Sequence, residues 1–166
     1  GAYRPSRLVP NSEIVDLIDS SDEWIVQRTG IESRRFAGAD ESVVDMAIGA
    51  AEQALSRAKL TITDIDTVVV ATITYPHQAP SAATAIIQRM GNPTAAALDI
   101  SAACAGFCYG VAMAHDMVRA GSAKKVLVIG VEKISDFTDP TDRATAFIFA
   151  DGAGAVVIGE STEAGI

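Results

Sequence analysis

The sequence lacks the features that would suit a membrane-spanning or nucleic-acid-binding protein. No apolar run approaches the ~18 residues that a membrane-spanning helix needs, and no secretory signal is visible. Basic residues are in the minority, with 13 Lys and Arg against 21 Asp and Glu and a formal net charge of −8. A nucleic-acid-binding surface would be basic instead. We therefore expect neither a membrane span nor a nucleic-acid partner.

Cysteine is also scarce, since only Cys104 and Cys108 occur. The two lie on one expected helix at a spacing where side chains share a face but lack disulfide geometry. Without a structural disulfide, a reducing, cytoplasmic location is expected. His115 lies on the same helix, but about 16 Å further along its axis than Cys104, at about 1.5 Å per residue. One metal ion cannot bind both side chains, so we expect no metal site.

Apolar residues, in contrast, are plentiful. They make up 49% of the 166 residues, enough for one globular domain with a real core. Strand-like and helical patterns alternate through the middle of the chain. Strands are expected over 67–74, 95–100, 125–131 and 155–159, with helices over 81–90 and 104–120. This order predicts an α/β fold, a layered sheet with covering helices.

The N-terminal part has mainly helical patterns. Asn11 is a favourable N-cap for a short helix over 11–18. The sequence Ser-Ser-Asp-Glu at 20–23 predicts a capping box that opens the next helix. Asp40 is expected to cap a longer helix through Ala58, whose apolar residues fall on one face.

Cys104 stands where the chain is expected to turn from a strand into a helix, within Asp-Ile-Ser-Ala-Ala-Cys-Ala-Gly-Phe at 99–107. The positive end of a helix favours the thiolate form of a cysteine. The small neighbours would let a substrate carbonyl approach the backbone. This pattern predicts a nucleophile elbow with sulfur in place of oxygen. An inert cysteine in the core is the alternative that the local pattern leaves open.

Four stretches together resemble the N-terminal half of the β-ketoacyl-acyl-carrier-protein synthase III family, in the thiolase superfamily. They are Asp-Glu-Trp-Ile-Val-Gln-Arg-Thr-Gly-Ile (22–31), the Cys104 elbow, Asp-Pro-Thr-Asp-Arg (139–143) and Phe-Ala-Asp-Gly-Ala-Gly-Ala (149–155). They follow the family's order across nearly the whole chain. The resemblance implies a thiolase-like fold, with 1–166 as an N-terminal half-domain. The catalytic His and Asn of the family would lie in a C-terminal half outside this chain, so neither His77 nor His115 is assigned a role.

The resemblance also implies an activity, a decarboxylative Claisen condensation that initiates type II fatty-acid synthesis. Cys104 would take an acyl group from acyl-CoA, and the carbanion formed from malonyl-acyl carrier protein would then attack the thioester. Such an enzyme would be a cytoplasmic homodimer. Acyl-CoA is its substrate, so no separate cofactor is expected.

Further site residues follow from the same resemblance. Trp24 would stack on the CoA adenine, and Arg28 and Arg143 would contact the CoA nucleotide. From the residues alone, Trp24 is equally a core anchor, and each arginine could serve a surface salt bridge. Ala79 matches a position that shapes the acyl pocket across the dimer interface, where a small side chain leaves room for longer or branched primers.

Residues 1–5 resemble the end of the family's opening strand, which we expect to be truncated here and central to the sheet. The isolated chain should then fold poorly and lack condensing activity. Several other functions stay open. They are a polyketide-priming ketosynthase, another thiolase-superfamily enzyme such as hydroxymethylglutaryl-CoA synthase or thiolase, and a non-enzymatic half that only dimerises or binds acyl groups.

Overall fold

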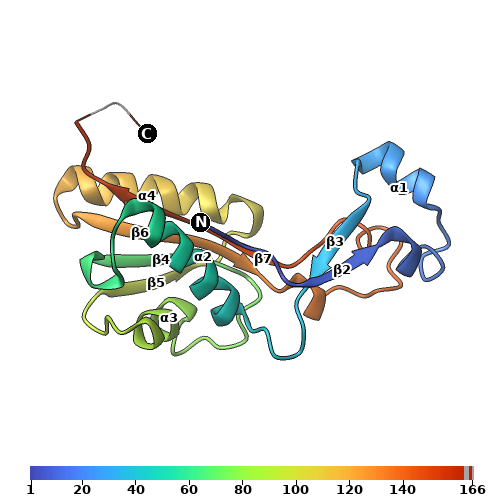
Figure 1. The fold of residues 1–166 in the computed structure, drawn as a ribbon, viewed down its shortest axis with the longest axis horizontal. Coiled ribbons are helices and arrows are strands. Elements are labelled where there is room, and N and C mark those ends of the chain that lie inside the picture. Colours follow the sequence, from blue (N-terminus) through green and yellow to red (C-terminus); the bar gives the residue numbers. More distant parts are fainter. Residues whose placement is uncertain (163–164, 166) are drawn as a thin grey trace.

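A mixed sheet forms the centre of the computed structural model, which describes residues 1–162 and 165 (Figure 1). Its strand order is β1–β7–β6–β4–β5. The strands are β1 (Ala2–Tyr3), β4 (Thr67–Ala71), β5 (Ala96–Ile100), β6 (Lys125–Glu132) and β7 (Gly152–Gly159). Strand β4 pairs in parallel with β5 and β6, whereas β7 runs antiparallel to β6 and β1. The α/β fold expected from the sequence is confirmed.

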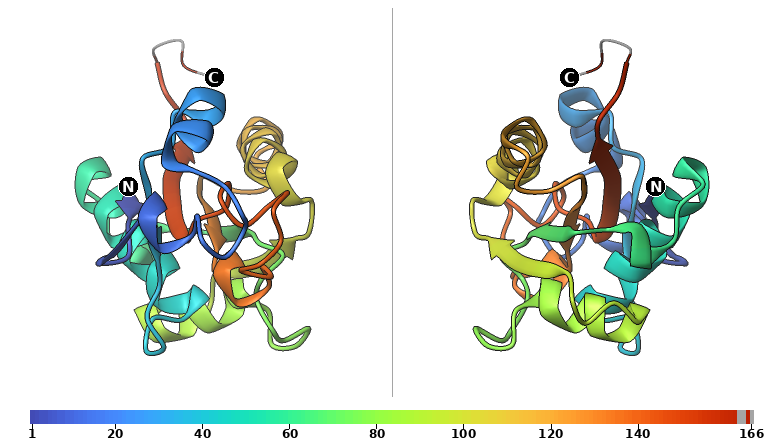
Figure 2. Two further views of the ribbon diagram at one scale, coloured as in Figure 1. Left: turned by 90° about the vertical axis from the view of Figure 1, so that its right-hand side faces the viewer. Right: turned by 90° about the vertical axis from the view of Figure 1, so that its left-hand side faces the viewer.

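Helices cover both faces of this sheet (Figure 2). Helices α2 (Val43–Ala58) and α3 (Ala82–Met90) lie on one face, and α4 (Gly106–Ala120) lies on the other. All five residues of β4 are buried, as expected for a parallel strand covered on both sides. Alternate side chains of a strand point to opposite faces. Val68 therefore packs with α2 and α3, and Val69 with α4.

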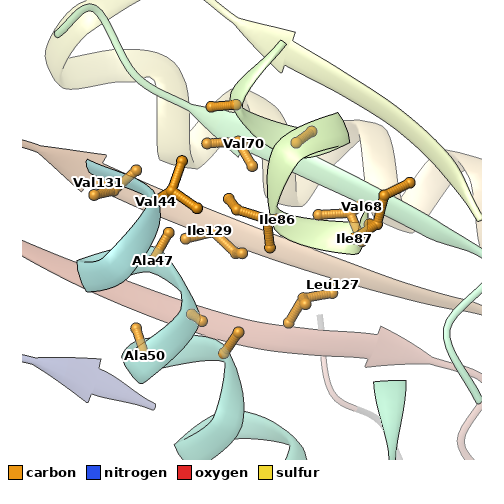
Figure 3. Close-up of a cluster of buried hydrophobic side chains, with 14 of the residues drawn as sticks. Val44, Ala47, Ala50, Val68, Val70, Ile86, Ile87, Leu127, Ile129 and Val131 are labelled. Carbon is orange, nitrogen blue, oxygen red and sulfur yellow. The ribbon is translucent and has the colours of Figure 1, made fainter. Parts of the chain in front are cut away.

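The larger core lies between the sheet and the α2–α3 layer (Figure 3). Small side chains such as Ala47 and Ala50 on α2 let this helix approach the sheet closely, and both are fully buried. Ile86 of α3 and Ile129 of β6 fill the space between the elements and are also fully buried. The apolar face expected for the helix ending at Ala58 thus forms the contact with the sheet.

A smaller lobe projects from one end of the sheet (Figure 1). It contains the antiparallel pair β2 (Arg7–Pro10) and β3 (Ser33–Phe36), together with α1 (Asp22–Thr29). Its separate core also includes Ala146 and Phe147, which belong to the long connection between β6 and β7. This core therefore joins α1 to a segment more than a hundred residues further along the chain.

Asn11 does not begin the short helix expected over 11–18. A single 3-10 turn forms over Asn11–Glu13, followed by further turns. The Asn11 side chain is buried, and its Nδ2 donates to Asp22 Oδ1 at 2.7 Å and to the Ile31 carbonyl at 2.8 Å. Asn11 Oδ1, the atom that a cap would use, instead accepts from Arg34 Nη2 of β3 at 2.6 Å.

Two helix starts also differ from expectation. Ser21 rather than Ser20 caps α1, because its Oγ accepts the Trp24 N–H at 3.2 Å. Helix α2 begins after Ser42, beyond the expected Asp40, because Ser42 and Asp45 form a reciprocal capping box. Ser21 and Ser42 therefore provide the N-caps of these helices, in place of Ser20 and Asp40.

The first strand is not central, contrary to expectation. β1 lies at the sheet edge and pairs with β7, where Ala2 lies opposite Gly154. β7 itself begins at Gly152, before the expected 155, because residues 152–154 (Gly-Ala-Gly) pair with the end of β6. Within residues 1–162, no helix combines the length and apolar character needed to cross a membrane.

Asp45 provides a test of how α2 is held. Its carboxylate accepts hydrogen bonds from Ser42 and lies 2.8 Å from Arg89 Nη2 of α3, which lowers the pKa of Asp45 to about 2. We expect Asp45→Asn to lower the free energy of unfolding by about 1 kcal/mol at pH 7, a value reduced because the side chain is partly exposed. Because the pKa of Asp45 is lower in the folded than in the unfolded chain, its carboxylate stabilises the fold at pH values above the unfolded pKa. The difference in unfolding free energy between wild type and Asp45→Asn should therefore shrink as the pH falls from about 4 to about 2.

The measurement is urea denaturation at pH 7 and near pH 2, with Glu52→Gln as a charge-matched control on the exposed face of the same helix. An equal loss at pH 7 and near pH 2 would contradict the assignment.

Candidate active site

Cys104 lies between the end of β5 and the start of α4, at the strand-to-helix turn predicted from the sequence. It sits in a 3-10 turn over Ala103–Ala105, so the regular helix begins at Gly106 rather than at the cysteine as expected. Cys104 is exposed, which contradicts the alternative of an inert core cysteine. The thiol therefore lies at the positive end of a long helix and is open to solvent.

The turn is held in an uncommon conformation. Ala103 has φ of 45°, in the left-handed region that non-glycine residues rarely adopt. Such local strain persists where surrounding contacts enforce it, and it clusters at functional sites. Gly106 supplies one such contact, because a Cβ there would lie 2.9 Å from the Ala71 Cβ of β4. The close approach of α4 to β4 thus fixes the turn that presents Cys104.

Cys104 opens into a hollow of about 400 Å³ at the ends of β4 and β6 and the start of β7. Residues 150–154, the Gly-Ala run singled out in the sequence, form one wall of it. Four of these five residues are Ala or Gly with little or no side chain, which leaves space beside the thiol; the fifth is Asp151. The other residues lining the hollow are Ala71, Ala103, Phe107, Gly130, Val131 and Glu132.

Glu132, at the end of β6, is a site residue that the sequence pattern did not single out. Its carboxylate accepts the Ile73 N–H at 3.0 Å, the Thr74 hydroxyl at 2.6 Å and the Thr72 hydroxyl at 3.3 Å. These bonds bend the chain after Ala71, which is why β4 ends there rather than at the expected 74. Glu132 thereby anchors the loop that leads from β4 toward α3.

Asp151, just before β7, was also missed as an individual residue. Its carboxylate accepts the Ala37 N–H at 2.7 Å, and the Ser135 N–H and hydroxyl at 2.9 and 2.6 Å. Asp151 is buried and lines the same hollow as Cys104. It joins three segments where the smaller lobe meets the sheet. A lone Asp before a glycine gives no sequence signal for this, since its partners are distant along the chain.

Trp24 and Arg28 lie side by side on α1, as predicted. The Arg28 guanidinium carbon lies 4.3 Å from the centre of the Trp24 ring, within cation–π range. Trp24 also meets Phe147 edge-on, with ring centres 5.3 Å apart. Part of the indole packs against the core of the smaller lobe, and the rest is exposed to solvent. Trp24 can therefore be a core residue and still offer a ring face to a ligand.

The remaining predicted site residues are not gathered around Cys104. Arg143 is exposed, with Nη1 3.6 Å from Asp19 Oδ2, on the same connection as Phe147. Ala79 is exposed in the loop between β4 and α3 and does not line the hollow. His77 packs against Tyr75, and neither His77 nor His115 lines the hollow. Among the described residues, no three His, Cys, Asp or Glu side chains cluster as metal ligands would.

The fold, with Cys104 at the turn into α4, places the chain among proteins with a thiolase-like fold. The solved structure of 3-oxoacyl-[acyl-carrier-protein] synthase III from Aquifex aeolicus VF5 matches with a TM-score of 0.95 and 42% identity, covering 98% of this chain and 53% of that one. The priming β-ketosynthase of the R1128 polyketide pathway matches with a TM-score of 0.94 and 45% identity, covering 97% and 48%.

Sequence comparison finds similarity to the same family. The model of the 3-oxoacyl-[acyl-carrier-protein] synthase III family matches residues 98–166. β-Ketoacyl-[acyl-carrier-protein] synthase III 1 of Streptomyces coelicolor is 55% identical over all 166 residues, which cover 48% of that protein. The synthase of Mycobacteroides abscessus is 54% identical, with 49% covered. The chain is thus similar to the N-terminal half of β-ketoacyl-[acyl-carrier-protein] synthase III proteins, as its motifs indicated, and spans about half the length of these relatives.

The strained turn gives a direct prediction. In Ala103→Val, a β-branched side chain would have to adopt the left-handed region, at a cost of about 1–2 kcal/mol, and we expect the turn to relax away from its present form. Alkylation of Cys104 by iodoacetamide should then slow, while that of Cys108 should not. Peptide mass mapping separates the two rates.

Ala103→Gly is the matched control, since glycine adopts this conformation freely and should keep the wild-type rate at Cys104. Equal alkylation rates in the valine and glycine variants would show that the backbone conformation at 103 does not govern the thiol.

Proposed function

We propose that this chain is the N-terminal half of an acyltransferase that initiates type II fatty-acid synthesis. The supporting observation is Cys104 itself, exposed in a strained turn before the first residue of α4 and open to a hollow lined in part by Ala and Gly residues. The same exposure argues against a non-enzymatic structural half. A C-terminal half would supply the catalytic His and Asn, which the described residues of this chain do not place near the thiol.

The proposed first step is acyl transfer. The Cys104 thiolate attacks the carbonyl carbon of acyl-CoA, and the collapse of the tetrahedral adduct breaks the bond to CoA sulfur, so that CoA leaves as a thiol. The Cys104 N–H, at the helix mouth, would supply half of the oxyanion hole. The second donor would come from the C-terminal half. The product is an acyl thioester on Cys104, which stays reactive toward a carbon nucleophile.

The second step is condensation. Malonyl-acyl carrier protein loses CO2, and its carbanion attacks the acyl carbonyl and expels the Cys104 thiolate. The β-ketoacyl group stays on the carrier protein, and the enzyme returns to its starting state. Acyl-CoA and malonyl-acyl carrier protein are thus the proposed partners. The proposal includes a cytoplasmic homodimer without a separate cofactor.

The proposed CoA nucleotide subsite uses the smaller lobe. Trp24 would stack on adenine, with Arg28 and Arg143 contacting the nucleotide. The stack of Arg28 on Trp24 supports this, because a π-face and a cation then lie together on a half-exposed surface. A priming ketosynthase of a polyketide pathway is the second candidate function, favoured by the 45% identity to the R1128 enzyme.

The proposal is tested by acylation of the full-length protein. Incubation with acyl-CoA should add one acyl mass, and Cys104→Ala should abolish the addition. Cys108→Ala is the matched control, since this second exposed cysteine lies on the next turn of α4 and should leave acylation unchanged. Intact-mass spectrometry reads both results. Retained acylation in Cys104→Ala, or its loss in Cys108→Ala, would refute the assignment.

Primer choice is tested at Ala79. In the proposed homodimer, Ala79 would help to shape the acyl pocket across the dimer interface. Its small side chain would leave space there, so we expect measurable condensation with isobutyryl-CoA. Ala79→Phe should reduce the isobutyryl-CoA rate at least about tenfold relative to acetyl-CoA, because one bulky ring would fill the space of a branched primer. Competition between the two primers, read by product mass, gives the ratio. Strict acetyl-CoA selectivity, unchanged in the variant, would remove this part of the proposal.

A further inference from the structure

Arg34 of β3 is a buried cation that has no carboxylate partner among residues 1–162. It is 5% exposed, and its Nε makes no hydrogen bond. Within the described residues, its guanidinium instead contacts neutral acceptors: the Val9 carbonyl, Asn11 Oδ1 and the Phe147 carbonyl. Burial lowers the pKa of Arg34, as expected for a charge removed from water. Such a group is costly, and apolar replacements of buried charges are often neutral or stabilising. Stability alone does not explain it.

The contacts of Arg34 explain what the charge does. Nη2 donates to Asn11 Oδ1 at 2.6 Å and to the Phe147 carbonyl at 3.1 Å, so a single nitrogen joins two distant segments. Asn11 in turn donates to Asp22 Oδ1 at 2.7 Å, at the first residue of α1. The two segments joined by the guanidinium are therefore the start of α1 and the β6–β7 connection.

These two segments carry the proposed nucleotide subsite. Trp24 and Arg28 lie on α1, and Arg143 lies on the connection four residues before Phe147. Phe147 also meets the Trp24 ring edge-on. A shift of Phe147 relative to α1 would thus move Arg143 and tilt Trp24 together. The spacing between the two halves of the subsite depends on the Arg34 bridge.

We propose that Arg34 is a positioning residue for the CoA nucleotide subsite, holding α1 and the β6–β7 connection at the spacing that the nucleotide requires. The inference rests on the proposed function of Trp24, Arg28 and Arg143. Lysine cannot replace it, because one ammonium on a flexible stem lacks the planar fork that reaches Val9 and the other two acceptors at once.

The test compares two primers on the full-length enzyme. One is acyl-CoA, and the other is the matching acyl-pantetheine, which carries the same thioester without the nucleotide. In Arg34→Met we expect the KM for acyl-CoA to rise about tenfold with kcat nearly unchanged, because only binding of the nucleotide is impaired. The KM for acyl-pantetheine should stay at the wild-type value. Arg34→Lys should show the same selective defect.

Two further variants make the comparison specific. Arg35→Met removes the neighbouring arginine of β3, which donates to the Pro5 and Ser6 carbonyls, and should change neither KM. Trp24→Ala removes the proposed stacking residue itself and should raise the KM for acyl-CoA but not for acyl-pantetheine. If Arg34→Met does not fold, Asn11→Ala decides the question, because it cuts the link to α1 and should produce a smaller rise for acyl-CoA only.

Each outcome has a separate meaning. Equal rises for both primers, no rise for either, or full rescue by Arg34→Lys would overturn the positioning role. If wild-type enzyme uses acyl-CoA and acyl-pantetheine with the same KM, or Trp24→Ala has no effect, the proposed nucleotide subsite fails and the inference fails with it. If acyl-CoA does not acylate the wild-type protein, the proposed function itself is wrong.

Discussion

The close contact between α4 and the central strands is the constraint on which the candidate site depends. Small residues recur at every fourth position of the helix, at Gly106, Gly110 and Ala114, and all three are buried against the sheet. A Cβ at Gly110 would lie 2.9 Å from Val128 Cγ1, so no larger residue fits without movement. The helix therefore packs closely against the sheet, and its first turn contacts the end of β4. The exposed thiol, its strained turn and the hollow beside it all follow from that position.

A second constraint joins the smaller lobe to this centre. The lobe is built from β2, β3 and α1 near the start of the chain, but it is completed by the connection that leads into β7. Buried polar groups make this joint: the Asp151 carboxylate at the sheet and the Arg34 guanidinium inside the lobe. Directional hydrogen bonds fix geometry in a way that apolar packing alone does not. The lobe and the hollow are in this way parts of one arrangement.

Much of the central fold could be predicted because its information is local. The unbroken apolar run of β4 predicts a buried strand. The glycine after α3 predicts the end of that helix, and Gly91 indeed ends α3 in the left-handed conformation. The turn at Cys104 was predictable for the same reason, since small residues between a strand and a helix permit the tight turn that joins them. The family resemblance then connected segments that no local pattern relates.

The parts that could not be predicted depend on distant partners. Asn11 is a good cap in isolation, but its amide instead serves Asp22 and Ile31. The edge position of β1 is set by pairing with β7 at the far end of the chain. Glu132 and Asp151 are ordinary acidic residues in the sequence, and only the folded chain surrounds them with donors. Topology and polar networks are tertiary properties, and single-residue preferences do not contain them.

The anchoring of the β4–α3 loop by Glu132 has a consequence for how this scaffold could diversify. The carboxylate fixes the first three residues of the loop to the end of β6, next to the thiol, while the tip around Ala79 is exposed and lies outside that network. Substitutions at the tip can therefore accumulate without disturbing the residues that set the thiol in place. The loop tip and the surroundings of Cys104 are therefore structurally independent, so natural variation can alter the tip while the residues around the thiol stay constant.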